Sequence, residues 1–266
     1  MWGGPSSTIV AVPGSSGGFR GAHWGDAGFI VYAVGSHRGL IRVPEVGGVP
    51  DTLTAPEGGE IHGRPYVLPG GEFVLFRSTR NGEPEVALLS LESGEYEVLT
   101  QGDDPHYVRG GFLVFRRGGA LWAATFDAGQ GRLTGDPVPV VEGVRSGNRF
   151  FALSDDGTLV FVTGAGGSDG DLVLVEADLE GGERLLPLGA RPIASVGWSP
   201  DGRSVVFESD NHIYTYDVTL NTAPRQITFE GDKLPARVLA GWHARRVQLA
   251  GPRHRRNRLV REGSHG

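Results

Sequence analysis

The chain alternates short apolar runs with turns rich in glycine, proline and aspartate. Runs such as residues 73–76, 113–115 and 159–162 are dominated by β-branched, aliphatic and aromatic side chains, which suit strands. The apolar runs are far shorter than the ~20 residues that a membrane-spanning helix needs. The pattern therefore predicts an all-β protein whose strands are joined by tight turns, with no membrane span.

The turns recur at a nearly fixed spacing. Five of them close on Gly28, Gly71, Gly111, Gly157 and Gly202, at intervals of 43, 40, 46 and 45 residues. Periods in the forties on short strands are typical of β-propellers, whose blades bury their faces against each other. We expect four-stranded antiparallel blades, in units at about 24–60, 61–104, 105–144, 149–190 and 193–232.

Two further features refine the propeller prediction. One large side chain stands four positions before each turn glycine, and we expect these five to be core residues rather than ligand contacts: Trp24, Val67, Tyr107, Leu153 and Trp198. Residues 6–12 look like the outer strand of an incomplete blade. Because a terminal strand often completes the blade at the other end of the chain, we expect about six blades in all.

Composition separates the last 34 residues from the rest. The chain has no cysteine and a net charge of −6, but residues 233–266 carry +8 and residues 1–232 carry −14. The absence of cysteine excludes disulfides, thiolate metal sites and a cysteine nucleophile, and it leaves the compartment open. Residues 1–5 lack the basic start and apolar core of an export signal.

The basic tail, residues 233–266, breaks the repeat. A turn is due near position 247, yet the chain has Trp242-His243-Ala244-Arg245-Arg246 there. If the codons permitted for these residues are read in a frame shifted by one base, they can encode Gly-Thr-Pro-Asp-Gly, a turn motif of the blades. We therefore hypothesise that the tail is a last blade read in a shifted frame. The alternative is an arginine-rich arm that binds nucleic acid or anionic lipid without sequence preference.

Motifs that could carry catalysis or metal binding have simpler explanations here. Residues 14–18 and 166–170 match the Gly-x-Ser-x-Gly spacing of a hydrolase nucleophile, but neither lies between a strand and a helix. The Asp-Gly turns lack the full set of calcium ligands, and the histidines lack zinc spacing, so we expect surface or capping roles for them. We predict no cofactor, no metal and no catalytic residue.

Propeller topology predicts a candidate binding face. Loops between the second and third strands open on the same face as the crossovers between blades, and this face we call the mouth. The first set of loops contributes His37, Arg38, Arg77, Arg80, Arg116 and Arg117, and the crossovers contribute His62, Arg64, His106, Arg145, Arg149 and Arg191. Such a mouth would favour a carboxylate, a phosphate or an acidic peptide, whereas the alternative is solvated loop arginines.

The sequence motifs at the turns resemble a known repeat class. They are similar to those of TolB-like, WD-type propeller repeats, and they occur at residues 21–26, 64–71, 153–161 and 198–202. Their succession, with residues 135–144, resembles the C-terminal sensor region of bacterial eukaryotic-like serine/threonine kinases. No kinase residue can be carried over, because the only lysine is Lys233 and no His-Arg-Asp or Asp-Phe-Gly occurs.

The resemblance implies a non-catalytic module that binds a protein, a peptide or another ligand, as part of a larger bacterial protein. In a membrane-anchored sensor kinase it would lie outside the cytoplasm. A propeller that accompanies a prolyl-oligopeptidase-type hydrolase and a TolB-type periplasmic translocation adaptor remain alternatives, because the same blades occur in all three contexts.

Overall fold

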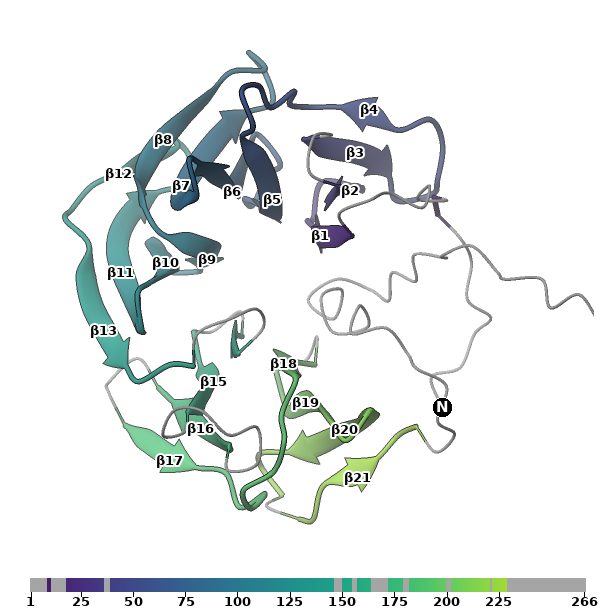
Figure 1. Cartoon of the computed structure of the whole chain (residues 1–266), viewed down its shortest axis with the longest axis vertical. Coiled ribbons are helices and arrows are strands. Elements are labelled where there is room, and N and C mark those ends of the chain that lie inside the picture. Colours follow the sequence, from purple (N-terminus) through teal and green to yellow (C-terminus); the bar gives the residue numbers. More distant parts are fainter. Residues whose placement is uncertain are drawn as a thin grey trace, which may run out of the picture.

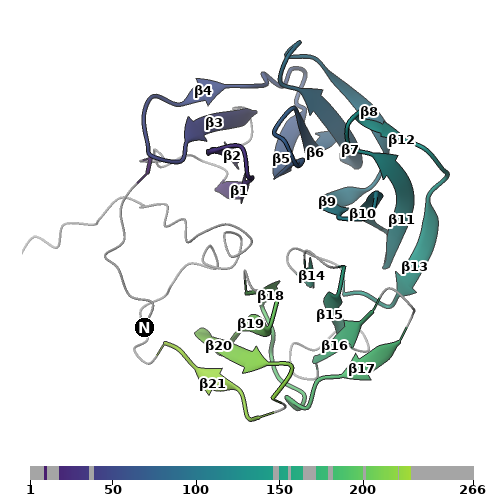
Figure 2. The same ribbon diagram turned by 180° about the vertical axis from the view of Figure 1, so that it is seen from behind.

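The computed structural model describes residues 9–10, 18–35, 39–145, 150–154, 157–163, 172–178, 182–199, 202–220 and 222–228. In this part of the chain, 21 strands form five antiparallel sheets arranged around a common axis (Figure 1; Figure 2 gives the opposite view). The prediction of an all-β propeller with four-stranded antiparallel blades is confirmed. No helix among the described residues is long and apolar enough to cross a membrane.

Each blade is a meander in which consecutive strands pair. The first two blades contain β1 (Phe19–Trp24), β2 (Phe29–Val34), β3 (Leu40–Pro44), β4 (Asp51–Thr52), β5 (Ile61–Val67), β6 (Phe73–Arg80), β7 (Glu83–Ser90) and β8 (Tyr96–Gln101). The third contains β9 (Asp103–Val108), β10 (Phe112–Arg117), β11 (Ala120–Asp127), β12 (Arg132–Leu133) and β13 (Val138–Glu142). The last two contain β14 (Phe151–Leu153), β15 (Leu159–Thr163), β16 (Val173–Ala177), β17 (Glu183–Leu185), β18 (Ser195–Trp198), β19 (Ser204–Ser209), β20 (His212–Asp217) and β21 (Arg225–Gln226).

The third blade has an outer edge divided between two strands. β11 pairs with the short β12 at its end and with β13 along its first half. The sequence pattern predicted an outer strand at 138–141, which is β13, but it missed β12. Two residues are too few to leave a period in the sequence, so only the pairing identifies β12 as a strand.

Glycine closes the turn between the first and second strands of every blade. Gly28, Gly71, Gly111, Gly157 and Gly202 all have positive φ, between 67° and 91°, where a side chain would be strained. In the last four blades the glycine N–H donates to the carbonyl three residues earlier, at 2.9–3.2 Å. The predicted role of these glycines is confirmed.

The second strand of a blade is apolar at consecutive positions because both of its faces are covered. In β2, Val31 and Ala33 pack in a cluster shared with the second blade, whereas Ile30 and Tyr32 pack on the opposite face. Successive side chains of a strand point to opposite faces, so a strand between two neighbours needs an unbroken apolar run. β6, β10 and β15 divide their side chains in the same way.

The five large residues before the turns differ in burial. Trp198 is 1% exposed, and its Nε1 donates to the carbonyl of Ala152 in the fourth blade at 3.3 Å. Val67 and Leu153 are also buried. Trp24 and Tyr107 are half-buried, and the Nε1 of Trp24 donates to a carboxylate oxygen of Glu45. The core interpretation therefore holds fully for Trp198 and only in part for Trp24.

Two predictions lie outside the described residues. Of residues 6–12, only Ile9 and Val10 are described, and both pack beside the first blade. The sixth blade and the basic tail at 233–266 therefore remain predictions.

Removing the Trp198 side chain should destabilise the joint between the last two blades. We expect Trp198→Ala to lower the free energy of unfolding by about 3–5 kcal/mol, because it leaves a cavity among buried neighbours. Leu185→Ala in β17, where the side chain is 66% exposed, is the matched control and should cost about 0.5 kcal/mol or less. Urea unfolding measures both, and equal losses for the two variants would contradict this packing.

Candidate functional site

The innermost strands of the first three blades share a backbone irregularity. β1, β5 and β9 each contain a register shift, and Gly21, Arg64 and Asp104 have positive φ there, at 117°, 52° and 56°. These positions are 43 and 40 residues apart, the same intervals as the turn glycines. A non-glycine residue in this region costs on the order of 1 kcal/mol, and such strain concentrates at functional sites.

Charged side chains from the inner strands meet beside these bulges, between the second and third blades. We call Arg64, Arg77, Arg116, Asp103 and Asp104 the arginine cluster. Nη2 of Arg116 donates to Oδ2 of Asp103 at 2.6 Å, and Nη1 of Arg64 donates to Oδ1 of Asp104 at 3.2 Å. Oδ1 of Asp103 lies 3.6 Å from Nε of Arg64 and 3.5 Å from Nη1 of Arg77. Three guanidinium groups thus share two carboxylates.

Burial shifts the pKa values of the charged groups in the arginine cluster, where three arginines face two aspartates. Burial alone would raise the pKa of Asp104, but the Arg64 guanidinium and His106 outweigh it and hold that pKa well below its usual range. Burial would likewise lower the pKa of Arg64, but Asp104 and Asp103 raise it above its ordinary value. The pKa of Arg77 is lowered, because burial and repulsion from Arg64 and Arg20 exceed the attraction of Asp103.

The cluster also contains buried polar atoms whose hydrogen bonds are not satisfied within the described structure. Nε of Arg64, Arg77 and Arg116 and Oδ1 of Asp103 have no hydrogen-bond partner there. Leaving a buried charged donor unpaired costs more than the net gain of an ordinary hydrogen bond. The site is therefore a partly desolvated cluster in which three cations face two anions and the pairing is incomplete.

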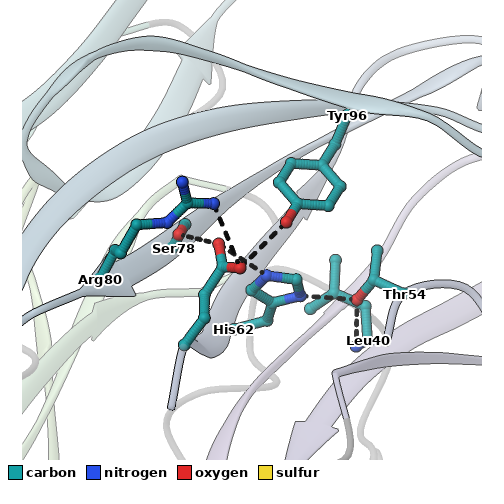
Figure 3. Close-up of polar contacts among 7 residues, drawn as sticks. Leu40, Thr54, His62, Ser78, Arg80 and Tyr96 are labelled. Atoms are coloured by element: carbon teal, nitrogen blue, oxygen red, sulfur yellow. Dashed lines mark hydrogen bonds and ion pairs between the residues drawn. The ribbon is translucent and has the colours of Figure 1, made fainter. Parts of the chain in front are cut away.

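A second polar group, the Glu60 network, lies between the first and second blades (Figure 3). The Glu60 carboxylate is 4% exposed; it accepts the hydroxyl of Ser78 at 2.6 Å and that of Tyr96 at 3.0 Å. Nε2 of His62 lies 3.2 Å from Oε1 of Glu60, and Nδ1 of His62 lies 2.7 Å from Oγ1 of Thr54.

The Glu60 network is held ionised at its centre and neutral at its histidine. Burial would raise the pKa of Glu60, but hydrogen bonds from Ser78, His62 and Tyr96 lower it overall. Burial lowers the pKa of His62 despite the adjacent carboxylate. The surface or capping role expected for histidines is therefore wrong for His62, because it is a core residue, but it fits His23, whose Nδ1 accepts the backbone N–H of Val67.

The order threonine, histidine, glutamate resembles that of a catalytic triad. However, Oγ1 of Thr54 already accepts the backbone N–H of Leu40 at 2.9 Å, and Thr54 is buried. A substrate could not reach this hydroxyl without opening the joint between two blades. The arrangement therefore suits a structural tie rather than a nucleophile.

An open hollow of about 470 Å³ lies beside the Glu60 network. Its lining comprises Ala55, Glu57, Gly58, Glu60, Arg80, Asn81 and Tyr96. Arg80 is 60% exposed, and its Nη2 lies 3.4 Å from Oε2 of Glu60. The hollow therefore combines one exposed cation, Arg80, with two anions, the buried Glu60 and the exposed Glu57.

Of the remaining predicted site residues that the structure describes, only His106 lies beside the arginine cluster. Arg117 stacks over Trp122 at 4.7 Å and donates to the carbonyl of Gln101. Arg145 lies over the ring of Phe150, and Arg191 lies over that of Phe207. His106 sits 3.7 Å from Asp104. His37, Arg38 and Arg149 lie outside the described residues.

The structure thus brings together three of the predicted arginines, Arg64, Arg77 and Arg116, and ties His62 and Arg80 to the Glu60 network. Sequence analysis missed Asp103 and Asp104, the carboxylates that compensate the arginines. Their signal was available: Asp104 stands at the same repeat position as Arg64. Among the described residues, no group of three or more His, Asp or Glu is placed to hold a metal ion.

Comparison with known proteins supports the fold. No protein-family model matches the chain, and no curated protein does. Solved structures do match. TolB from Acinetobacter baumannii matches with a TM-score of 0.61 and 21% identity, covering 78% of this chain and 54% of the TolB chain. Oligogalacturonate lyase from Vibrio parahaemolyticus matches with a TM-score of 0.56 and 15% identity, covering 80% of this chain and 68% of the lyase chain. A puromycin-hydrolysing peptidase from Mycobacterium tuberculosis also matches, with a TM-score of 0.53 and 16% identity, covering 83% of this chain and 47% of the peptidase chain.

These neighbours are proteins of different kinds and are at most 21% identical to this chain, so they bear on its fold and not on its function. The chain spans little more than half of the TolB chain and under half of the peptidase chain. What the comparisons establish is a TolB-like β-propeller.

Removing the charge of Asp104 should cost more stability than removing an exposed aspartate. We expect Asp104→Asn to lower the free energy of unfolding by about 2 kcal/mol or more, because Arg64 loses its closest anion in a desolvated site. Asparagine tolerates the left-handed backbone, so charge is the main change. Asp51→Asn, which breaks the exposed pair with Arg42, should cost about 0.5 kcal/mol or less. A smaller loss for Asp104→Asn than for Asp51→Asn would contradict the cluster.

The buried, neutral His62 should make stability depend on pH below about 6.5. Its folded pKa is lowered from 6.5, so the unfolded chain binds a proton that the folded chain does not, and stability is lost as pH falls through that range. The slope cannot exceed about 1.4 kcal/mol per pH unit from this one group. Urea unfolding between pH 7.5 and 5.5 should give a shallower slope for His62→Gln than for the wild type. Equal slopes would contradict the assignment.

Proposed function

We propose that this propeller is a non-catalytic recognition module that binds an acidic protein or peptide at the arginine cluster. The observation that carries the proposal is the excess of guanidinium groups over carboxylates among Arg64, Arg77, Arg116, Asp103 and Asp104, on strands near the axis. An anion from a partner would supply the missing negative charge.

The negative average charge of the chain does not oppose this binding. Local field and the fork geometry of guanidinium groups decide where an anion binds, and Arg77 remains 18% exposed. The rigid blades support the loops and inner strands without needing to move, which suits recognition by a preformed surface.

The sequence motifs also bear on the kind of protein to which this module belongs. We infer that it is part of a larger bacterial protein similar to a propeller-bearing serine/threonine kinase. The support is the turn motifs, such as that at 198–202, and the segment 135–144. Any catalytic activity would then belong to another domain. A hydrolase accessory domain and a translocation adaptor are the alternatives, and the coding sequence on either side of this chain distinguishes them.

An acidic peptide should bind in a way that depends on the arginine cluster. We expect fluorescein-labelled hexaglutamate to bind by fluorescence anisotropy, more weakly as salt is raised, and hexaserine not to bind. Arg77→Ala combined with Arg116→Ala should weaken binding about tenfold or more. The control is Arg42→Ala combined with Arg132→Ala on strands β3 and β12, and circular dichroism confirms that each variant is folded. Equal weakening by both pairs would refute binding at the cluster.

A further inference from the structure

We propose that Arg77 is the residue that contacts the acidic partner, and that a carboxylate of this partner completes a charge cluster that the fold leaves short of anions. This inference rests on the proposed function. It divides the arginine cluster into two structural arginines, Arg64 and Arg116, and one arginine kept for the ligand.

The contacts of the three arginines are unequal. Arg116 is paired in register with Asp103 across β9 and β10 and donates to it at 2.6 Å. Arg64 contacts both aspartates and donates to Asp104. Arg77 has one long contact, 3.5 Å to Oδ1 of Asp103, and that oxygen is shared with Arg64. Of the three arginines in the cluster, Arg77 is therefore the one whose charge the aspartates compensate least.

Electrostatics agree with the contacts. Burial and the positive charges of Arg64 and Arg20 lower the pKa of Arg77, whereas the aspartates raise that of Arg64. A poorly paired, partly desolvated cation weakens a folded structure. A neutral side chain of similar length at position 77 would remove this cost to folding stability. Stability alone therefore does not favour a charged side chain at this position.

The surroundings place Arg77 where a partner can reach it. Its Nε is enclosed, so the exposed part of the guanidinium includes the terminal nitrogens, which can donate two parallel hydrogen bonds to a planar carboxylate. The strained backbones of Arg64 and Asp104 beside it hold the neighbouring charges in position. Binding would add a negative charge at the terminal nitrogens of Arg77, in a site of low effective dielectric where each such hydrogen bond is stronger than in water.

The first experiment measures binding of labelled hexaglutamate to the full chain. Arg77→Met keeps length and removes charge, and it should weaken binding at least tenfold. Arg77→Lys keeps charge without the fork and should give an intermediate affinity. Arg42→Met, on β3 and paired with the exposed Asp51, is the matched control and should bind as the wild type does.

The second experiment measures stability without peptide, by urea unfolding. Arg77→Met should unfold at the same or a higher urea concentration than the wild type, whereas Arg116→Met should unfold at a lower one because Asp103 loses its closest partner.

Each outcome decides between the claims. If the wild type binds hexaglutamate and Arg77→Met binds it equally well, the assignment of Arg77 is overturned while the proposed function stands. If Arg77→Met is destabilised as much as Arg116→Met, Arg77 is a structural residue and the inference also fails. If the wild type does not bind hexaglutamate, the proposed function fails, and this inference fails with it.

Discussion

The structure depends on one constraint: the second strand of a blade is apolar on both faces and is buried only when both faces are covered, in the middle blades by the two neighbouring sheets. β2, β6, β10 and β15 have apolar side chains on both faces, and alternate positions belong to different clusters. A single blade would expose one of these faces to water, at a cost of roughly 25 cal/mol for each Å². We therefore expect the blades to be stable when packed against one another and not as separate units.

The same packing determines where polar chemistry can occur. Apolar clusters fill the spaces between blades, so charged side chains collect near the inner strands. The second blade carries the Glu60 network toward the first blade and the arginine cluster toward the third. The Glu60 network centres on one carboxylate, which accepts two hydroxyl groups and contacts His62 and Arg80. The arginine cluster has three guanidinium groups for two carboxylates, and this excess of positive charge is the reason we propose binding there.

Sequence analysis could predict the features that repeat. The turn glycines and the strand order follow from the repeat interval, as between Gly28 and Gly71, and the second strands follow from their unbroken apolar runs. Such patterns exist because the local backbone and the neighbouring blades impose the same requirement on every unit.

Features that depend on contacts between blades could not be predicted in the same way. The bulge at Arg64 is a property of strand pairing, and an arginine with positive φ contradicts ordinary preferences. Burial of His62 depends on Thr54 and Glu60 together. The predicted ring of twelve basic residues treated every loop arginine alike, whereas stacking on rings engages Arg117, Arg145 and Arg191.

The most direct test of the account is a crystal structure of the protein with hexaglutamate bound. The account predicts a peptide carboxylate at the terminal nitrogens of Arg77, with the pairs of Arg64 to Asp104 and of Arg116 to Asp103 retained. A peptide bound on another face of the ring, or a chain in which Arg77 is already fully paired with its own carboxylates, would contradict it.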